Sequence, residues 1–204
     1  MYPAGFDFPL AFPAAKIAVT EIIREAATII MLAGVGVMAG RNFTERFAAF
    51  IYSFAVWDLF YYLFLKAILG WPPSLLTWDI LFLIPVSWTS PVICPVIVSL
   101  TMILLALIVF WFNKTTVVIL QMKEWLILIA GSVIIILSFI WDFSMFVLSR
   151  YSFSTLLLPG GGDILTLCGA VYIPHSFNWI LFGVGEAVIL SAILVLYFRL
   201  SKGK

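Results

Sequence analysis

The stretch WLILIAGSVIIILSFIWDFSMFVLS, residues 125–149, decides the fold class. It contains one charged side chain, Asp142, among long apolar and aromatic residues. A membrane-spanning helix needs about 20 mostly apolar residues, because the hydrocarbon core of a bilayer is about 30 Å thick. The stretch is therefore long enough and apolar enough to cross a membrane as one helix.

The composition of the whole chain agrees with a membrane location. Of its 204 residues, 64% are apolar and only 10% are charged. Soluble domains are about 45–50% apolar and about 25% charged, and a soluble protein of this size could not hide so much apolar surface from water. The net charge is +1 and no basic stripe suits nucleic acid. We therefore expect an integral membrane protein whose main partner is the lipid bilayer.

Four further apolar runs have the length of a spanning helix. Together with 125–149, the spans are expected at 16–40, 47–69, 91–112 and 175–200. Pro85, Pro91 and Pro95 interrupt the apolar residues between 74 and 112, and proline breaks a helical backbone. The sequence thus predicts an all-α polytopic bundle of about five spanning helices, with one short re-entrant or interfacial helix at 75–84. All of it belongs to one transmembrane domain, 1–204.

The distribution of Lys and Arg predicts the orientation. Cytoplasmic flanks carry the excess of basic residues, and one side of the predicted topology holds Arg41, Arg46, Lys114, Lys123, Arg199, Lys202 and Lys204. The C-terminal tail, 201–204, is then cytoplasmic. The N-terminal arm, 1–15, and the loop 150–174 lie on the exoplasmic side. We expect a multi-pass protein of a cell membrane, with the bacterial inner membrane as the expected location.

The ionisable residues of the spans gather toward the predicted outer side. A charged group at membrane depth costs about 2.5–3.5 kcal/mol on insertion scales, so such groups mark functional sites by default. We expect them to converge on one outward-opening cavity. The carboxylates are Glu21, Glu25, Asp58, Asp79, Asp142 and Glu186, and the basic groups are Arg24, Lys66, Arg150 and the only histidine, His175.

The excess of carboxylates leaves two chemical interpretations open. Crowded carboxylates in a low dielectric either bind a cation or retain protons. As a metal site, the ligands would be Glu21, Glu25, Asp58, Asp142, His175 and Glu186, a set that suits Fe, Mn or Zn. As a proton-handling or catalytic site, the carrying residues would be Glu25, Asp58 and Asp142, with Arg24 balancing charge. No Glu-x-x-His or His-x-x-x-His motif supports the metal.

Three functions fit these patterns. The first is a membrane protein that binds a divalent metal or relays protons, for redox or hydrolytic chemistry on a lipophilic or small substrate. The second is an accessory subunit of a larger membrane complex, in which the acids lock helices together. The third is a proton- or ion-coupled transporter that uses the proline-broken segment. No nucleophile elbow, zinc-protease motif or dinucleotide fingerprint selects an enzyme class. Cys94 and Cys168 both map to the outer side, where a disulfide can form.

Overall fold

The computed structural model describes residue 8 and residues 15–83, 86–156 and 160–202. Within this part of the chain, five helices are long and apolar enough to cross a membrane. They are α1 (Ala15–Ala39), α2 (Phe43–Leu69), α3 (Ile93–Asn113), α4 (Met122–Leu148) and α7 (Trp179–Lys202). The prediction of an all-α bundle with five spanning helices is confirmed.

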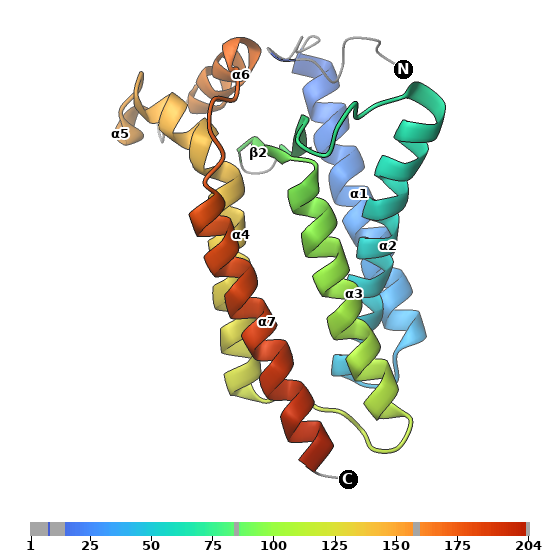
Figure 1. Ribbon diagram of the computed structural model, residues 1–204. Helices are drawn as coiled ribbons and strands as arrows, with labels where there is room; N and C mark the ends of the chain where they lie inside the picture. Colours follow the sequence, from blue (N-terminus) through green and yellow to red (C-terminus); the bar gives the residue numbers. More distant parts are fainter. Residues whose placement is uncertain (1–7, 9–14, 84–85, 157–159, 203–204) are drawn as a thin grey trace.

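The spanning helices form two groups that lie side by side (Figure 1). α2 packs against both α1 and α3, α4 packs against α7, and a smaller contact between α3 and α7 joins the groups. Glycine permits the close approach of α4 and α7. A Cβ atom on Gly185 would lie 2.6 Å from Cγ1 of Ile135, so a small residue is required at this crossing.

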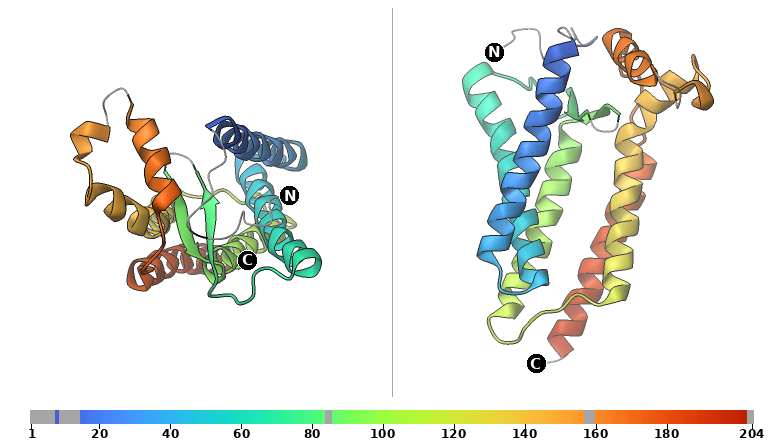
Figure 2. Two further views of the ribbon diagram at one scale, coloured as in Figure 1. Left: turned by 90° about the horizontal axis from the view of Figure 1, so that it is seen from above. Right: turned by 180° about the vertical axis from the view of Figure 1, so that it is seen from behind.

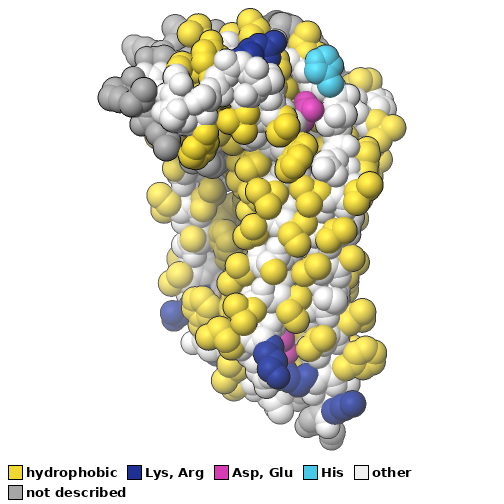
Figure 3. All heavy atoms as spheres, turned by 90° about the vertical axis from the view of Figure 1, so that its left-hand side faces the viewer, with side chains coloured by type: hydrophobic (Ala, Val, Ile, Leu, Met, Phe, Trp, Pro, Cys, Tyr) yellow, Lys and Arg dark blue, Asp and Glu magenta, His cyan; other side chains and the backbone are white. Residues whose placement is uncertain are grey.

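The two ends of the bundle differ in the residues that they carry. The hairpin end holds the start of α1, the end of α2 and a β-hairpin, whereas the basic end holds the 114–121 connection and the end of α7 (Figure 1). On the face that Figure 3 shows, Lys and Arg lie toward the two ends and apolar side chains cover the length between them. This apolar belt is the surface that a bilayer would contact.

Local capping sets the helix starts at the basic end. The Asn42 side chain accepts a hydrogen bond of 3.0 Å from the backbone N–H of Glu45 and begins α2. Gln121 and Glu124 form a reciprocal capping box that begins α4. Such caps satisfy backbone donors that the first helical turn leaves unpaired. α2 therefore begins at 43 instead of the expected 47, and α4 at 122 instead of 125.

The predicted short helix at 75–84 is wrong. Trp78–Phe82 form strand β1, which pairs antiparallel with β2, Trp88–Pro91. A short apolar run that is rich in aromatic residues does not distinguish a strand from a helix by its periodicity. The partner strand β2 stabilises the extended conformation, because it pairs with backbone N–H and C=O groups of β1. The hairpin crosses the end of the bundle between the two helix groups (Figure 2).

The expected loop at 150–174 is also more structured than predicted. It contains two helices, α5 (Phe153–Leu156) and α6 (Gly161–Val171). The last spanning helix begins at Trp179, so His175 precedes this helix and does not open it. The expected arm at 1–15 lies outside the described residues except for Phe8 and Ala15, and so do residues 203–204 of the expected tail.

An apolar core fills the basic half of the bundle. It is built from α2, α3, α4, α7 and the connection between α3 and α4. Its buried members are Ala48, Ile51, Leu105, Ala106, Val109, Phe112, Val118, Leu120, Leu128, Ala192, Ile193 and Leu196. The hairpin half is built differently, because polar side chains and a cavity interrupt its apolar contacts.

Candidate functional site

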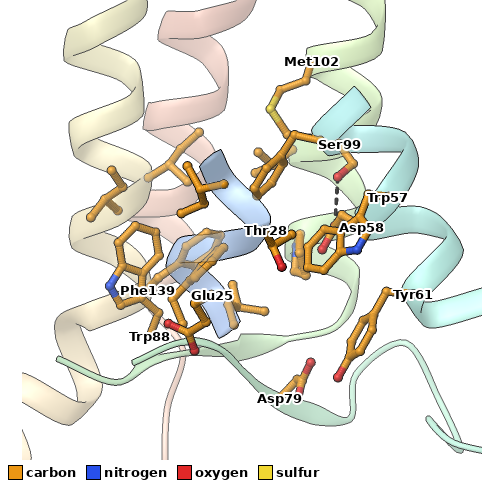
Figure 4. A pocket seen from close by; sticks show the side chains of 18 of the residues that line it. Glu25, Thr28, Trp57, Asp58, Tyr61, Asp79, Trp88, Ser99, Met102 and Phe139 are labelled. Carbon is orange, nitrogen blue, oxygen red and sulfur yellow. Dashed lines mark hydrogen bonds between the residues drawn. The ribbon is translucent and has the colours of Figure 1, made fainter. Parts of the chain in front are cut away.

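A cavity of about 270 Å³ lies in the hairpin half of the bundle. α1, α2, α3 and α4 form its walls, the hairpin lies over one end, and one residue of α7 reaches it. Most of its surface is apolar or aromatic. The polar or ionisable side chains among its lining residues are Arg24, Glu25, Thr28, Asp58, Tyr61, Tyr62, Asp79, Ser99 and Ser132. Figure 4 shows how several of them are arranged around the space.

Asp58 holds a central place in the wall formed by α2. Its Oδ2 atom accepts a hydrogen bond of 2.9 Å from Oγ of Ser99 on α3, and Figure 4 shows this pair beside Trp57. Both Asp58 and Ser99 line the cavity. A carboxyl group at this depth in an apolar bundle needs such a partner, because a buried polar group without one is costly.

The β-hairpin forms the roof of the cavity through Ile80, Phe82 and Trp88. On one side, the backbone N–H of Leu83 donates to Oε2 of Glu25 on α1 over 3.2 Å. This hydrogen bond fastens the end of β1 to α1.

A second pair fastens the roof to α2. The phenol of Tyr62 donates to Oδ2 of Asp79 on β1 over 2.9 Å, and both residues are buried. Burial raises the pKa of the Asp79 carboxyl to about 7, against the lowering effect of the Tyr62 hydrogen bond. The roof thus contains a carboxyl group that titrates near neutrality.

A third fastening ties the other strand to α4. The hydroxyls of Thr89 on β2 and Tyr172 lie 3.1 Å apart, and Tyr172 donates to Oδ2 of Asp142 over 2.6 Å. The backbone N–H of His175 donates to the same oxygen over 3.2 Å. Burial raises the pKa of the Tyr172 phenol above its ordinary value, and the hydrogen bond to Asp142 raises it as well. Asp142 therefore binds two residues of the connection between α6 and α7 and holds this connection against α4.

The basic end is closed by a separate polar network. Glu124, which is 1% exposed, accepts hydrogen bonds of 2.7 and 2.9 Å from Nε and Nη2 of Arg199. Arg199 Nη2 also donates to the carbonyl of Ile119 in the connecting segment. On the other side, Thr44 Oγ1 accepts from the backbone N–H of Leu120. The connection is thus tied to both helix groups beneath the apolar core.

The structure brings together only some of the residues singled out in the sequence. Arg24, Glu25 and Asp58 line the cavity, and Asp79 joins them from the hairpin. Asp142 and Glu186 are absent from its lining residues, and so is His175, whose side chain is exposed. The side chain of Glu21 lies outside the described part of the structure.

Glu186 lies in a polar contact of its own between α7 and α3. Its Oε2 atom accepts a hydrogen bond of 3.0 Å from Oγ1 of Thr101, and the residue is 7% exposed. The other oxygen, Oε1, has no hydrogen-bond partner among the described residues. Glu186 therefore joins the two helix groups and is not part of the cavity.

The described residues do not support the metal hypothesis. They contain no group of three or more His, Cys, Asp or Glu side chains placed to hold a metal ion. Cys94 and Cys168 are both buried free thiols, so the disulfide considered from the sequence is not formed. Burial raises the pKa of the Cys168 thiol, which keeps it in its unreactive form.

Several contributors to the site were not recognised from the sequence. Ser99 is a small polar residue within the most apolar helix, and its position on the α2-facing side could not be read without the bundle geometry. Trp88 lines the cavity, and its indole Nε1 is buried without a hydrogen-bond partner among the described residues. The Glu124–Arg199 ion pair was likewise missed, although a Glu in the first turn of a helix is a recognised capping signal.

Comparisons with protein-family models, with curated proteins and with solved structures found no match for the chain.

Proposed function

We propose that this membrane protein binds a small lipophilic molecule in the cavity of its hairpin half, with Asp58 and Glu25 holding the polar end of that molecule. One observation carries the proposal. Three carboxyl side chains from three different elements, Glu25, Asp58 and Asp79, line a single apolar-walled space. Binding sites for small molecules are characteristically apolar concavities with a few convergent polar groups.

The arrangement of the walls supports access from the lipid. The roof is fastened to α1, α2 and α4 by hydrogen bonds, and the apolar core fills the basic half beneath. α1 and α4 both line the cavity but are not a closely packed pair of helices, and they stand apart in the view from behind (Figure 2). We propose that a molecule dissolved in the bilayer enters between them, because this route crosses neither the roof nor the core.

The proposed orientation places the cavity in the outer half of the membrane. Basic residues gather at the end that carries the 114–121 connection and the last turn of α7, where Lys114, Lys123, Arg199 and Lys202 lie. The positive-inside rule assigns this end to the cytoplasm. The hairpin and the cavity then face the exoplasmic leaflet of a cell membrane, for which we propose the bacterial inner membrane.

A role as an accessory subunit is the second candidate, and a different observation favours it. Each of Glu25, Asp58, Asp79, Asp142 and Glu186 accepts a hydrogen bond from another element of the fold. These bonds lock the elements together whether or not the cavity holds a ligand. A transporter receives less support, because apolar side chains and the Glu124–Arg199 network occupy the route to the basic end.

Native mass spectrometry tests the proposal with a matched pair of variants on α3. Val98 lines the cavity, whereas Leu100 is 55% exposed on the lipid-facing side of the same helix. Val98→Phe fills the cavity and Leu100→Phe adds the same ring outside it. The protein is released from nanodiscs made directly from the host membrane, so that a bound molecule is retained.

The proposal predicts one small-molecule adduct on the wild type and on Leu100→Phe, and its loss from Val98→Phe. An adduct that persists equally in both variants would place the bound molecule elsewhere. A protein that carries no adduct in any form but co-purifies with other subunits would favour the accessory role.

A further inference from the structure

The charged side chains that line the cavity are predominantly acidic. Among the described residues, the lining includes the carboxyl groups of Glu25, Asp58 and Asp79 and a single basic side chain, Arg24. Carboxyl groups that share a space of low dielectric do not all ionise unless a cation accompanies them. An anionic ligand would add to the repulsion, whereas a cation would relieve it.

Aromatic rings make up much of the remaining wall. Trp57 and Tyr61 stack at 6.1 Å between ring centroids on the side of Asp58, and Phe82 packs edge-on against Trp88 at 5.4 Å in the roof. All four residues line the cavity, together with Phe54, Tyr62 and Phe139. The face of an aromatic ring attracts a cation, most strongly where water is excluded. Aromatic walls and carboxyl groups together are the chemistry that recognises organic ammonium groups.

The size of the cavity limits what can lie wholly inside it. Its volume of about 270 Å³ lies below the range of roughly 300–1,000 Å³ that is usual for whole drug-sized ligands. This is enough for a compact head group but not for a lipid-like molecule with its chain. α1 and α4 both line the cavity and are not a closely packed pair, so the chain of such a molecule is placed between them.

These features identify a ligand class, an inference that rests on the proposed function. We propose that the cavity binds the head group of an amphiphilic organic cation, with the ammonium group beside Asp58 and the ring faces of Trp57 and Tyr61, and with the alkyl chain passing between α1 and α4. The hydrogen bond from Ser99 to Oδ2 of Asp58 holds the carboxyl group in the cavity wall, where it can pair with the ammonium group. Glu25 supplies a second carboxyl group on the α1 side of the cavity, near the roof.

Matched amphiphiles that differ only in their head groups test this assignment. The purified protein in nanodiscs is incubated with radiolabelled decyltrimethylammonium, and binding is followed by scintillation proximity. Decanol and decyl sulfate compete as the neutral and anionic counterparts with the same chain. Asp58→Asn removes the charge and keeps an acceptor for Ser99. Glu186→Gln neutralises another buried carboxyl, outside the cavity, and is the control.

The inference predicts saturable binding of decyltrimethylammonium that decanol and decyl sulfate displace at least about tenfold less well than the unlabelled cation. Asp58→Asn weakens the affinity at least about tenfold, Asp58→Glu restores part of it, and Glu186→Gln changes it little. The thermal unfolding temperature of each variant is measured alongside, so that a binding loss from misfolding is recognised.

Two contrary results have different meanings. If decanol binds as tightly as the cation and Asp58→Asn has no effect, the cationic ligand class is wrong while lipophile binding in the cavity survives. If every amphiphile binds Val98→Phe as well as the wild type, both the ligand class and the proposed function fail.

Discussion

Oη of Tyr62 donates a hydrogen bond of 2.9 Å to Oδ2 of Asp79 and thereby joins the last third of α2 to the first strand of the hairpin. Asp79 faces Ser90 across the hairpin, and the next paired position joins Ile80 to Thr89, which contacts Tyr172. Two tyrosine–carboxyl pairs, Tyr62–Asp79 and Tyr172–Asp142, thus hold the hairpin from its two sides. The roof of the cavity depends on both helix groups.

Tyr62→Phe should destabilise the protein by loosening this roof. The substitution leaves the buried Asp79 carboxyl without its phenol donor, and an unsatisfied buried acceptor costs about 1–3 kcal/mol. The thermal unfolding temperature in nanodiscs should fall, whereas Tyr52→Phe, at an exposed tyrosine of the same helix, should leave it almost unchanged. Equal behaviour of the two variants would show that the hydrogen bond contributes nothing.

The Asp79 carboxyl should make stability decrease as the pH rises toward neutrality. Its pKa is raised from 3.8 to about 7 by burial, so the folded protein binds more protons than the unfolded chain between these values. Stability is then largest at the acidic side of this window, falls through it, and levels off above about pH 7. The loss is of the order of a few kcal/mol, since each unit of pKa shift corresponds to about 1.4 kcal/mol.

Asp79→Asn isolates this effect, because the amide still accepts from Tyr62 but does not titrate. Unfolding temperatures measured between about pH 5 and about pH 8 should fall less steeply for Asp79→Asn than for the wild type. Identical slopes would assign the pH dependence to another group.

Gly185→Ala should weaken the contact between α4 and α7. The new methyl group would lie 2.6 Å from Ile135 Cγ1 and 3.0 Å from the Ile135 backbone nitrogen, and overpacking of this kind costs about 1–3 kcal/mol. Gly183→Ala is the matched control on the same helix, since a Cβ there meets nothing within 4 Å. It should be neutral or stabilising by up to about 1 kcal/mol. Denaturant unfolding of the two variants compares them directly.

Arg199→Gln should be the more damaging change at the basic end. It leaves the carboxylate of Glu124, which is buried, without its bidentate partner, and breaking a buried pair costs about 3 kcal/mol or more. The double variant Glu124→Gln/Arg199→Gln should recover part of that loss because no unpaired charge remains. Lys202→Gln, one turn further along α7, is the control. A double variant no more stable than Arg199→Gln would contradict the assigned pairing.

The spanning helices could be predicted because length and apolar composition alone identify them. The hairpin could not, because the apolar residues of β1 at Trp78–Phe82 suit either a strand or a short helix. Only pairing with Trp88–Pro91 distinguishes the two. Pairing is a relationship between two segments, and the local pattern of one segment does not contain it.

The sequence predicted how deep the acidic residues lie in the bundle, but it did not predict which neighbour each side chain faces. The topology placed Glu25, Asp58 and Asp142 at similar depth in the bundle, yet it could not tell which way each helix turns. Spanning helices are apolar on every side, so their sequences carry little information on rotation. Asp58 turns toward the cavity, whereas Asp142 turns toward Tyr172 and Glu186 toward Thr101.

Photolabelling tests most directly whether a lipophilic molecule occupies the cavity from the side of the bilayer. The probe is a decyl-chain ammonium amphiphile with a diazirine in its chain, irradiated with the protein in nanodiscs, and the labelled residues are mapped by mass spectrometry. The account predicts labelling concentrated on the residues of α1 and α4 that line the cavity, Ile29 and Ile136 among them. Excess unlabelled amphiphile should abolish it, and so should Val98→Phe. Labelling spread over the lipid-facing surface of all the helices, unaffected by either, would contradict it.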